Sequence, residues 1–422
     1  MNIIFCCFAS QRYWTDRQEL RLAFADICKE IGCHNQAFLI DEQFDYSILN
    51  DHRQDLILAL PMSGGVQPDV LRAAAYFDNV LLYAGYIKGS LSDELSPKML
   101  LRNAAPAVMD IYAVLRRSNP DIKLCTGKTE LGKRINAICA YQKLSDLKIL
   151  AIGQTEPWVI SAIRDWTVVK DRFGIEVIDV AQEELTKLYE NISTEEVTQA
   201  YHSWIGNAES ILEPTHPDIA NAVRFQEALL RLLCEYRASG AALACFNLLK
   251  TGTTSCLGAS YINTFTDYVV ACEGDMDSAI TMLIMKLLSK DSVWMANPNI
   301  QPDRMVNFVH CTAPTQIKGH KCNYILRNHH ESGIGVSTQV TLPQNTQMTA
   351  CRISNQLSQI TVQNCTGIKG TYEPSCRTQL NIQFEDFDKY VRTALGCHQI
   401  FAFEDIKQDL LYFAELAGLE VL

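Results

Sequence analysis

Short apolar runs alternate with amphipathic stretches in the first third of the chain. Residues 2–8 (NIIFCCF) are continuously apolar, which predicts a buried strand, and residues 17–31 carry apolar side chains at helical spacing. Gly32 follows as a helix stop signal. Further strand-like runs lie at 37–40, 55–61 and 79–85, with helical patterns near 66–76 and 97–117. This alternation predicts an α/β domain with a parallel sheet covered by helices, at residues 1–145.

The same pattern restarts at about residue 146. The predicted strands are LKILAIG (147–153), GIEVIDV (174–180), AALACF (241–246) and YVVACEGD (268–275). The predicted helices are PWVISAIRDW (157–166), segments near 181–190, 194–206 and 217–239, and SAITMLIMKLLS (278–289). We therefore expect a second α/β domain at residues 146–302.

The pattern changes from about residue 303 onwards. Short segments of alternating apolar and polar residues are separated by turn residues: TQVTLPQ (338–344), TACRISN (349–355), SQITVQNC (358–365) and TQLNIQF (378–384). Such alternation is typical of antiparallel strands with one buried face. An amphipathic helix near 404–418 ends the chain. Residues 303–422 are predicted to form a mostly antiparallel β domain.

Composition narrows the function classes. The 422 residues are 48% hydrophobic, and a single domain seldom exceeds roughly 250 residues, so a globular chain of two or three domains is expected. The net charge of −11 disfavours binding to nucleic acid and to anionic membrane surfaces. No apolar run is long enough for a membrane span, and the start lacks the features of a signal peptide. We expect a cytoplasmic protein whose sixteen cysteines are mostly small buried hydrophobic residues.

Three acids lie at the junction between a predicted strand and a predicted helix. Glu273, Asp275 and Asp277 occur in ACEGDMDSAITML (271–283). In open α/β sheets, ligands bind beyond the carboxyl ends of the strands. Acids also cap helices, and we assign that role to Asp275 or Asp277. Glu273 is then the acid at the tip of the strand.

Three further polar residues follow in the carboxyl-terminal part. Asn297 lies in WMANPNIQPD (294–303), which we expect to be a loop, although Asn-Pro is also an ordinary turn signal. His310 ends an apolar strand, and His398 lies between a turn glycine and a strand. Each histidine, taken alone, is also compatible with a purely structural role in the protein interior. Together with the acids, these residues are a plausible ligand set for a divalent ion such as Mn²⁺.

The combination of segments resembles the L-fucose isomerase/L-arabinose isomerase family. The similar segments are VVACEGDMDSAITMLI, the WMANP loop, HCTAP, CRTQ and a terminal GCHQI, and the resemblance is strongest from about residue 240 onwards. It implies two Rossmann-like α/β domains, a β-barrel-like carboxyl-terminal domain, bound Mn²⁺ and an oligomer, either a trimer or a hexamer. It also implies that Glu273 is a metal ligand and catalytic carboxylate, that His398 is a metal ligand, and that His310 is an additional ligand.

One position departs from the family. The second acid of the family falls on Asn297, whose amide oxygen is able to coordinate a hard cation but not to take up a proton. Asp275 is kept as the reserve catalytic acid. His329, His330 and Glu331 are candidates for binding sugar hydroxyls, with a solvated loop as the alternative. Arg377 is a candidate for an anionic group of the substrate or, equally, for one of the protein's own acids.

The sequence therefore favours a metal-dependent aldose–ketose isomerase acting on a monosaccharide such as a deoxyhexose, a pentose or a modified hexose through an enediol intermediate. In that reaction a metal stabilises the enediolate oxygens and a carboxylate moves the proton between C1 and C2. The alternative is a sugar-binding or regulatory homologue that kept the fold and lost the chemistry, because Asn297 replaces an acid. Another metal-assisted reaction on a carbohydrate is a third possibility.

Overall fold

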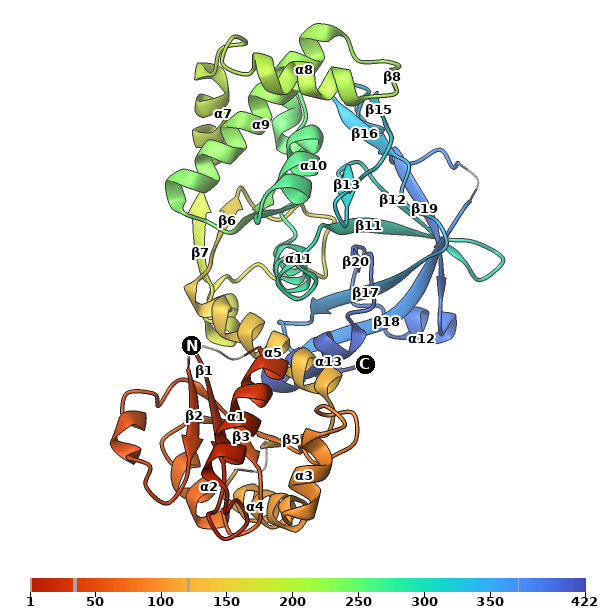
Figure 1. Cartoon of the computed structure of the whole chain (residues 1–422). Helices are drawn as coiled ribbons and strands as arrows, with labels where there is room; N and C mark the ends of the chain where they lie inside the picture. The colour runs from red at the N-terminus through yellow and green to blue at the C-terminus, as the bar shows by residue number, and fades with distance from the viewer. Residues whose placement is uncertain (1, 33–35, 120–121, 371) are drawn as a thin grey trace. The chain divides into compact units, whose positions relative to one another are not determined.

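The computed structural model describes residues 2–32, 36–119, 122–370 and 372–422 (Figure 1). Contacts within the chain divide it into two compact units, Met1–Ile135 and Asn136–Leu422. Helix α5 (Lys128–Lys143) begins in the first unit and ends in the second. Every candidate site residue named above belongs to the second unit.

The first unit is built on a parallel sheet with the strand order β2-β1-β3-β4-β5. Its strands are β1 (Ile3–Phe8), β2 (Ala37–Ile40), β3 (Leu56–Pro61), β4 (Asn79–Tyr83) and β5 (Lys123–Cys125). Its helices are α1 (Arg17–Ile31), the short 3-10 helix η1 (Tyr46–Leu49), α2 (Gln67–Ala74), α3 (Leu95–Leu101) and α4 (Ala104–Ser118). The predicted helix-covered parallel sheet is confirmed.

Helix α1 shows why local signals were sufficient in this region. Asp16 accepts hydrogen bonds from the backbone N–H groups of Gln18 and Glu19, which caps the start of the helix. Gly32 has a φ of 79°, so it ends the helix in the left-handed conformation that glycine adopts at little cost. Leu20, Ala23 and other apolar residues of one face are buried.

The second unit contains a parallel sheet with the order β10-β9-β6-β7. Its strands are β6 (Lys148–Ile152), β7 (Glu176–Val180), β9 (Gly240–Leu243) and β10 (Val269–Ala271). The helices of this part are η2 (Leu144–Asp146), α6 (Thr167–Phe173), α7 (Gln182–Asn191), α8 (Thr198–Asn207), α9 (His216–Tyr236), η3 (Phe246–Thr251), α10 (Cys256–Phe265) and α11 (Met276–Ser289). The chain passes from β6 to β7 on one side and later to β9 on the other, so the strand order reverses at β6. Ligands bind at such points, beyond the carboxyl ends of the strands.

A closed antiparallel barrel of six strands follows. The order β17-β20-β11-β12-β19-β18 closes through the pairing of β17 with β18. The strands are β11 (Val293–Ile300), β12 (Val306–His310), β17 (Thr346–Ser354), β18 (Gln359–Ile368), β19 (Thr378–Phe384) and β20 (Gln399–Ala402). Aromatic rings pack together inside the second unit: the centroids of Phe308 on β12 and Phe401 on β20, the two strands that flank β11, are 4.7 Å apart. The expected antiparallel β region is confirmed, and its strands close on themselves.

The remaining elements lie outside the six-strand ring. They are the sheet of β8 (Ser210–Ile211), β15 (Tyr324–Arg327) and β16 (Ser337–Val340), the hairpin of β13 (Gln316–Ile317) and β14 (His320–Lys321), strand β21 (Glu420–Val421), and helices α12 (Phe387–Arg392) and α13 (Lys407–Leu416). Among the described residues, no helix combines the length and the apolar character needed to cross a bilayer.

Helix α11 connects the parallel sheet to the barrel (Figure 1). Its apolar side chains belong to one buried cluster with Ala271 of the sheet and with Cys351 and Ile400 of the barrel. Since both neighbours are apolar, the helix is buried almost all round, as its sequence MDSAITMLIMKLLS requires. Its amino terminus, just after β10, therefore lies where the carboxyl edge of the sheet meets the barrel.

Two expectations about secondary structure are wrong. Residues 294–300 are not part of a loop, because Val293–Ile300 pair with β12 and β20 as strand β11, and only 301–303 lie outside it. Residues 157–166 are not a helix, because Arg164 donates to the carbonyl oxygens of Glu156, Val159 and Ala162 and so holds the segment in a folded loop. Strand β11 belongs to the barrel although it precedes the boundary expected at residue 302, and the division into three domains stays a prediction.

Candidate metal centre

Glu273, His310 and His398 come together from three separate segments. Glu273 follows β10, His310 is the last residue of β12, and His398 immediately precedes β20. One ligand atom from each side chain lies within 4.8 Å of the other two. Ligands bound at about 2.0–2.2 Å from one ion lie roughly 3–3.6 Å apart when they are adjacent, so the three side chains would have to move closer together to hold an ion. Both histidines are buried, whereas 14% of the Glu273 side chain is exposed.

A sharp turn aims Glu273 at the histidines. Glu273 has a φ of 60°, and Gly274 follows with a φ of 63°. A Cβ atom on Gly274 would lie 2.8 Å from the Cα atom of Thr155, so a larger residue does not fit there. The turn is held by the Glu156 N–H, which donates to the Glu273 carbonyl at 2.9 Å, and by the Thr155 hydroxyl, which donates to the Gly274 carbonyl at 2.9 Å. A non-glycine residue in this conformation is strained, and such strain clusters at functional sites.

His398 is oriented by two carboxylates. Its Nδ1 lies 2.7 Å from Asp275 Oδ2, and its Nε2 lies 3.4 Å from Glu273 Oε1. A carboxylate on Nδ1 fixes the proton on that nitrogen and leaves Nε2 as the metal-binding atom. Burial acts to lower the pKa of His398, but the hydrogen bonds with Asp275, Cys397 and Glu273 outweigh it and raise the pKa well above its usual value. A metal ion therefore competes with a proton for this ring.

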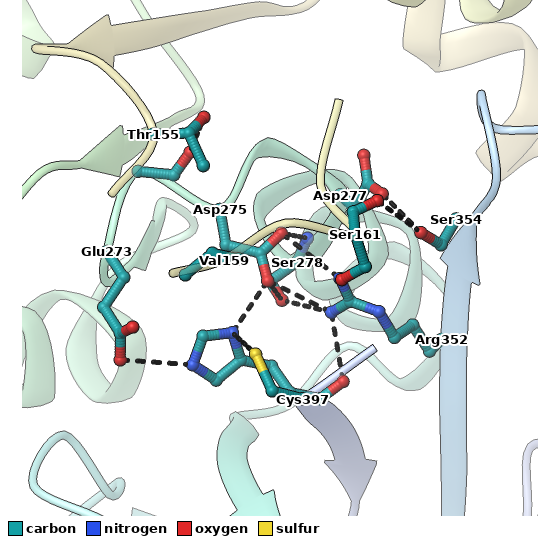
Figure 2. A network of polar contacts seen from close by, with 12 residues as sticks. Thr155, Val159, Ser161, Glu273, Asp275, Asp277, Ser278, Arg352, Ser354 and Cys397 are labelled. Atoms are coloured by element: carbon teal, nitrogen blue, oxygen red, sulfur yellow. Dashed lines mark hydrogen bonds and ion pairs between the residues drawn. The ribbon is translucent and has the colours of Figure 1, made fainter. Parts of the chain in front are cut away.

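Asp275 is itself fixed from the other side. It caps α11 by accepting from Ser278 N at 3.0 Å, and Arg352 Nη1 lies 3.1 Å from its Oδ2 (Figure 2). The Arg352 side chain is fully buried and also donates to the His398 carbonyl oxygen at 3.0 Å. Burial opposes ionisation of Asp275, but Arg352 and His398 lower its pKa below the usual range. The expected cap is confirmed at Asp275. We interpret the residue as an orienting carboxylate rather than a proton-transfer acid, because it is completely buried and ion-paired.

Asp277 is a second buried acid on the same helix. Ser354 donates to its Oδ2 at 2.5 Å (Figure 2), and the N–H of Ile163 donates to its Oδ1 at 3.3 Å. Burial, reinforced by the charge of Asp275, raises the pKa of Asp277 to about 6. Its contacts connect α11 to β17 and to the loop after β6, and they are structural.

His310 presents a neutral ring. The Thr312 hydroxyl lies 2.7 Å from its Nδ1, which leaves Nε2 for a metal. Burial, and next the charge of His398, lower the pKa of His310 to about 4. The two imidazole centroids are 6.1 Å apart. A neutral imidazole is the form that binds metals.

Asn297 lies beside the centre on the neighbouring strand. It pairs with Val309, the residue before His310. Within the described part of the chain, no hydrogen bond joins the Asn297 side chain to Glu273, His310 or His398. Asn297 instead lines an open pocket of about 420 Å³ together with His330, Glu331 and Cys376. The structure thus gathers three predicted residues, Asn297, His330 and Glu331, in this pocket.

The other two predicted residues are held by nearby groups. His329 Nδ1 lies 3.0 Å from the Ser332 hydroxyl, and its ring meets that of Phe246 edge to face at 5.9 Å. Arg377 donates from Nε to the Asn328 carbonyl at 2.9 Å and from Nη2 to the Asn328 side chain. The Arg377 guanidinium therefore supports the loop that carries His329 and His330.

Sequence reasoning missed three residues of the site. Trp158 Nε1 donates to Glu273 Oε2 at 2.7 Å, Glu156 is buried, and Arg352 supports Asp275. Burial first, and then the charge of Glu273, raise the pKa of Glu156, although the Phe246 N–H donates to its carboxylate. Arg352 had a visible signal, since it is a lone charge within the apolar alternation of TACRIS. Trp158 had none, because it lies in the segment 157–166 that was predicted to be a helix, and Glu156 immediately precedes that segment.

No protein-family model matches the chain, and no curated protein matches it.

Proposed function

We propose that the chain is a divalent-metal-dependent aldose–ketose isomerase that acts on a monosaccharide. The observation that carries the proposal is the convergence of Glu273, His310 and His398, with ligand atoms within 4.8 Å of one another. These are the residues for which the sequence resemblance implies metal binding. We further propose that the two parallel sheets belong to Rossmann-like domains, that the ion is Mn²⁺, and that the protein is a cytoplasmic homo-oligomer.

The donor set suits such an ion. Two imidazole nitrogens and one carboxylate are ligands of first-row divalent metals, and three protein ligands leave coordination positions for substrate oxygens. When bound, the ion would stabilise the negative charge that develops on the oxygens at C1 and C2 of the sugar. The neutral state of His310 and the orientation of His398 by Asp275 prepare both rings for this role.

The proton transfer is assigned to Glu273. It is the one partly exposed member of the three, and its pKa is lowered: burial raises it, but His398, Trp158 and the nearby His310 outweigh burial. The carboxylate is therefore ionised and able to accept a proton from the sugar carbon. Trp158 and the turn at Gly274 hold it in one orientation.

Asn297 affects the metal affinity that we expect of the site. With an amide in place of the second acid, the set carries a single negative charge. Metal binding should accordingly be weaker than in a site with two carboxylates, because fewer charges offset the cost of removing the ion from water. The same substitution favours the second candidate function, a sugar-binding homologue without catalysis.

The test is to incubate the Mn²⁺-loaded protein with a panel of aldopentoses and aldohexoses, including 6-deoxy sugars, in deuterated water. Ketose formation, with deuterium incorporated at C1 or C2, is the expected result. Glu273→Gln should abolish turnover and keep the fold, whereas Glu235→Gln, an exposed glutamate on α9, should leave turnover unchanged. Sugar binding without ketose or deuterium exchange for any sugar would instead establish the sugar-binding homologue.

A further inference from the structure

Three aromatic side chains form a continuous row beside the metal centre. The rings of Trp158 and Phe246 meet edge to face at 5.0 Å, and those of Phe246 and His329 at 5.9 Å. The row begins at Glu273, because Trp158 Nε1 donates to the Glu273 carboxylate. Its other end is His329, whose Nδ1 lies 3.0 Å from the Ser332 hydroxyl. The row therefore extends from one candidate ligand to the loop that carries His329 and His330.

Trp158 is the exposed member of this row. It is 54% exposed, although its neighbours Glu156 and Val159 are buried. Tryptophan left open to water forgoes the stabilisation that burial of its large apolar surface would give. Its position is nevertheless fixed, because the guanidinium of Arg164 donates to the carbonyl oxygens of Glu156 and Val159 on either side. A rigid loop thus displays an indole directly beside a metal-ligand carboxylate.

We infer that Trp158 is a specificity residue that stacks against the apolar C–H face of the sugar. The inference rests on the proposed function for the class of substrate. An aldose has polar hydroxyl edges and apolar C–H surfaces. An aromatic face next to a metal would contact the C–H surface, while the metal and Glu273 would contact the hydroxyl groups. Binding sites commonly combine an aromatic wall with a few fixed polar groups in this way. The hydrogen bond from Trp158 Nε1 to Glu273 would hold the indole in a fixed position relative to the reacting carbons.

Two variants separate stacking from the hydrogen bond to Glu273. Trp158→Phe keeps an aromatic ring and loses the N–H group, whereas Trp158→Leu loses both. The matched control is Trp166→Leu, because Trp166 also donates its N–H to a carboxylate, that of Asp179 at 2.8 Å, but lies outside the row. Steady-state kinetics with the best sugar and Mn²⁺ titrations are measured for each protein.

Stacking is made in the ground state and in the transition state alike, so its loss appears in KM. We expect Trp158→Leu to raise KM up to about tenfold. Trp158→Phe should change KM far less, and both variants should lower kcat by a similar factor through Glu273. Trp166→Leu should resemble the wild type. Equal KM values for Trp158→Leu and the wild type would overturn the inference.

A binding readout keeps the inference testable without turnover. Acrylamide quenching of Trp158 is obtained as the difference between the wild type and Trp158→Phe, with and without each sugar of the panel. Protection by a sugar supports stacking even if no ketose forms, in which case only the isomerase proposal fails. Sugar binding, measured by calorimetry, that leaves Trp158 fully quenchable overturns the inference. So does the absence of binding by every sugar, or a Trp158 already shielded without sugar by a second copy of the chain.

Discussion

His398 is the side chain on which most contacts of the candidate centre converge. One ring nitrogen faces Asp275, the other faces Glu273, and the backbone carbonyl accepts from Arg352. Each contact restricts a different freedom: the tautomer, the direction of the lone pair and the position of the main chain. Asp275 and Arg352, which lie outside the proposed ligand set, would therefore prepare the ring for a metal.

Asp275→Asn should weaken Mn²⁺ binding by about 10–100-fold, because the imidazole loses the carboxylate that fixes its tautomer. The same change leaves Arg352 buried without its charged partner, so the free energy of unfolding should fall by about 3–5 kcal/mol. Calorimetric Mn²⁺ titration and chemical denaturation measure the two effects separately.

The double variant Asp275→Asn/Arg352→Met distinguishes orientation from stability. Replacing the guanidinium removes the unpaired charge, so much of the lost stability should return. The affinity for Mn²⁺ should stay low, since Nδ1 still lacks its carboxylate. Recovery of Mn²⁺ affinity together with stability would show that Asp275 acts only through folding.

Asp277 gives a pH dependence of stability with a defined sign. Its pKa is about 6 in the folded protein against an ordinary value of 3.8. Between these values the folded state holds a proton that the unfolded state has lost, so this residue makes stability fall as pH rises from about 4 to 6. Above about pH 6 Asp277 is ionised in both states, so its destabilising effect on the folded protein no longer grows with pH.

Asp277→Asn should consequently stabilise the protein relative to the wild type as pH rises from 4 to 7, by about 3 kcal/mol. Urea denaturation at a series of pH values measures the difference. Asp171→Asn, an exposed aspartate on α6, is the control and should show no such gain. A difference between Asp277→Asn and the wild type that is constant over this range would refute the assignment.

At the scale of elements, the turn between β10 and α11 positions Glu273 and Asp275. In five residues the chain leaves the sheet, exposes Glu273, bends at Gly274 against Thr155 and starts a helix capped by Asp275. The positive φ values and the tight contact are a local property of this turn. Its integrity is therefore a condition for the candidate centre.

Gly274→Ala should destabilise the protein and weaken Mn²⁺ binding together. Gly252 is the matched control: it also has a positive φ, of 77°, but a Cβ atom there meets nothing within 4 Å. Gly252→Ala should cost only the conformational penalty of about 1–2 kcal/mol. Gly274→Ala adds overlap with backbone atoms of Gln154 and Thr155, which costs a further 1–3 kcal/mol or so. Equal losses of unfolding free energy would contradict the packing argument.

Elements with strong local signals were predictable from the sequence. Helix α1 has a cap, an apolar face and a glycine stop, and α11 has a mostly apolar sequence after its cap. Strand β11 was not predictable, because Asn297 and Pro298 are turn residues that the neighbouring strands of the barrel override. The loop at 157–166 was not predictable either, because its shape depends on hydrogen bonds from Arg164.

At the scale of the second unit, the candidate centre exists because two architectures meet. The parallel sheet delivers Glu273 at its carboxyl edge, and the closed barrel delivers His310 at the end of β12 and His398 just before β20. The residue types and their places at strand ends were readable in the sequence. Their proximity was not, since it depends on barrel closure over long sequence separations. The proximity of Arg352, which lies on a third barrel strand, was not predictable from the sequence for the same reason.

The most direct test of the central claim is pulsed electron paramagnetic resonance on the protein titrated with Mn²⁺. The account predicts one Mn²⁺ per chain with couplings to the nitrogens of two histidines. His310→Gln and His398→Gln should each remove one nitrogen coupling, and Glu273→Gln should weaken binding while retaining both. Mn²⁺ bound without nitrogen couplings, or bound equally well in all three variants, would contradict the account.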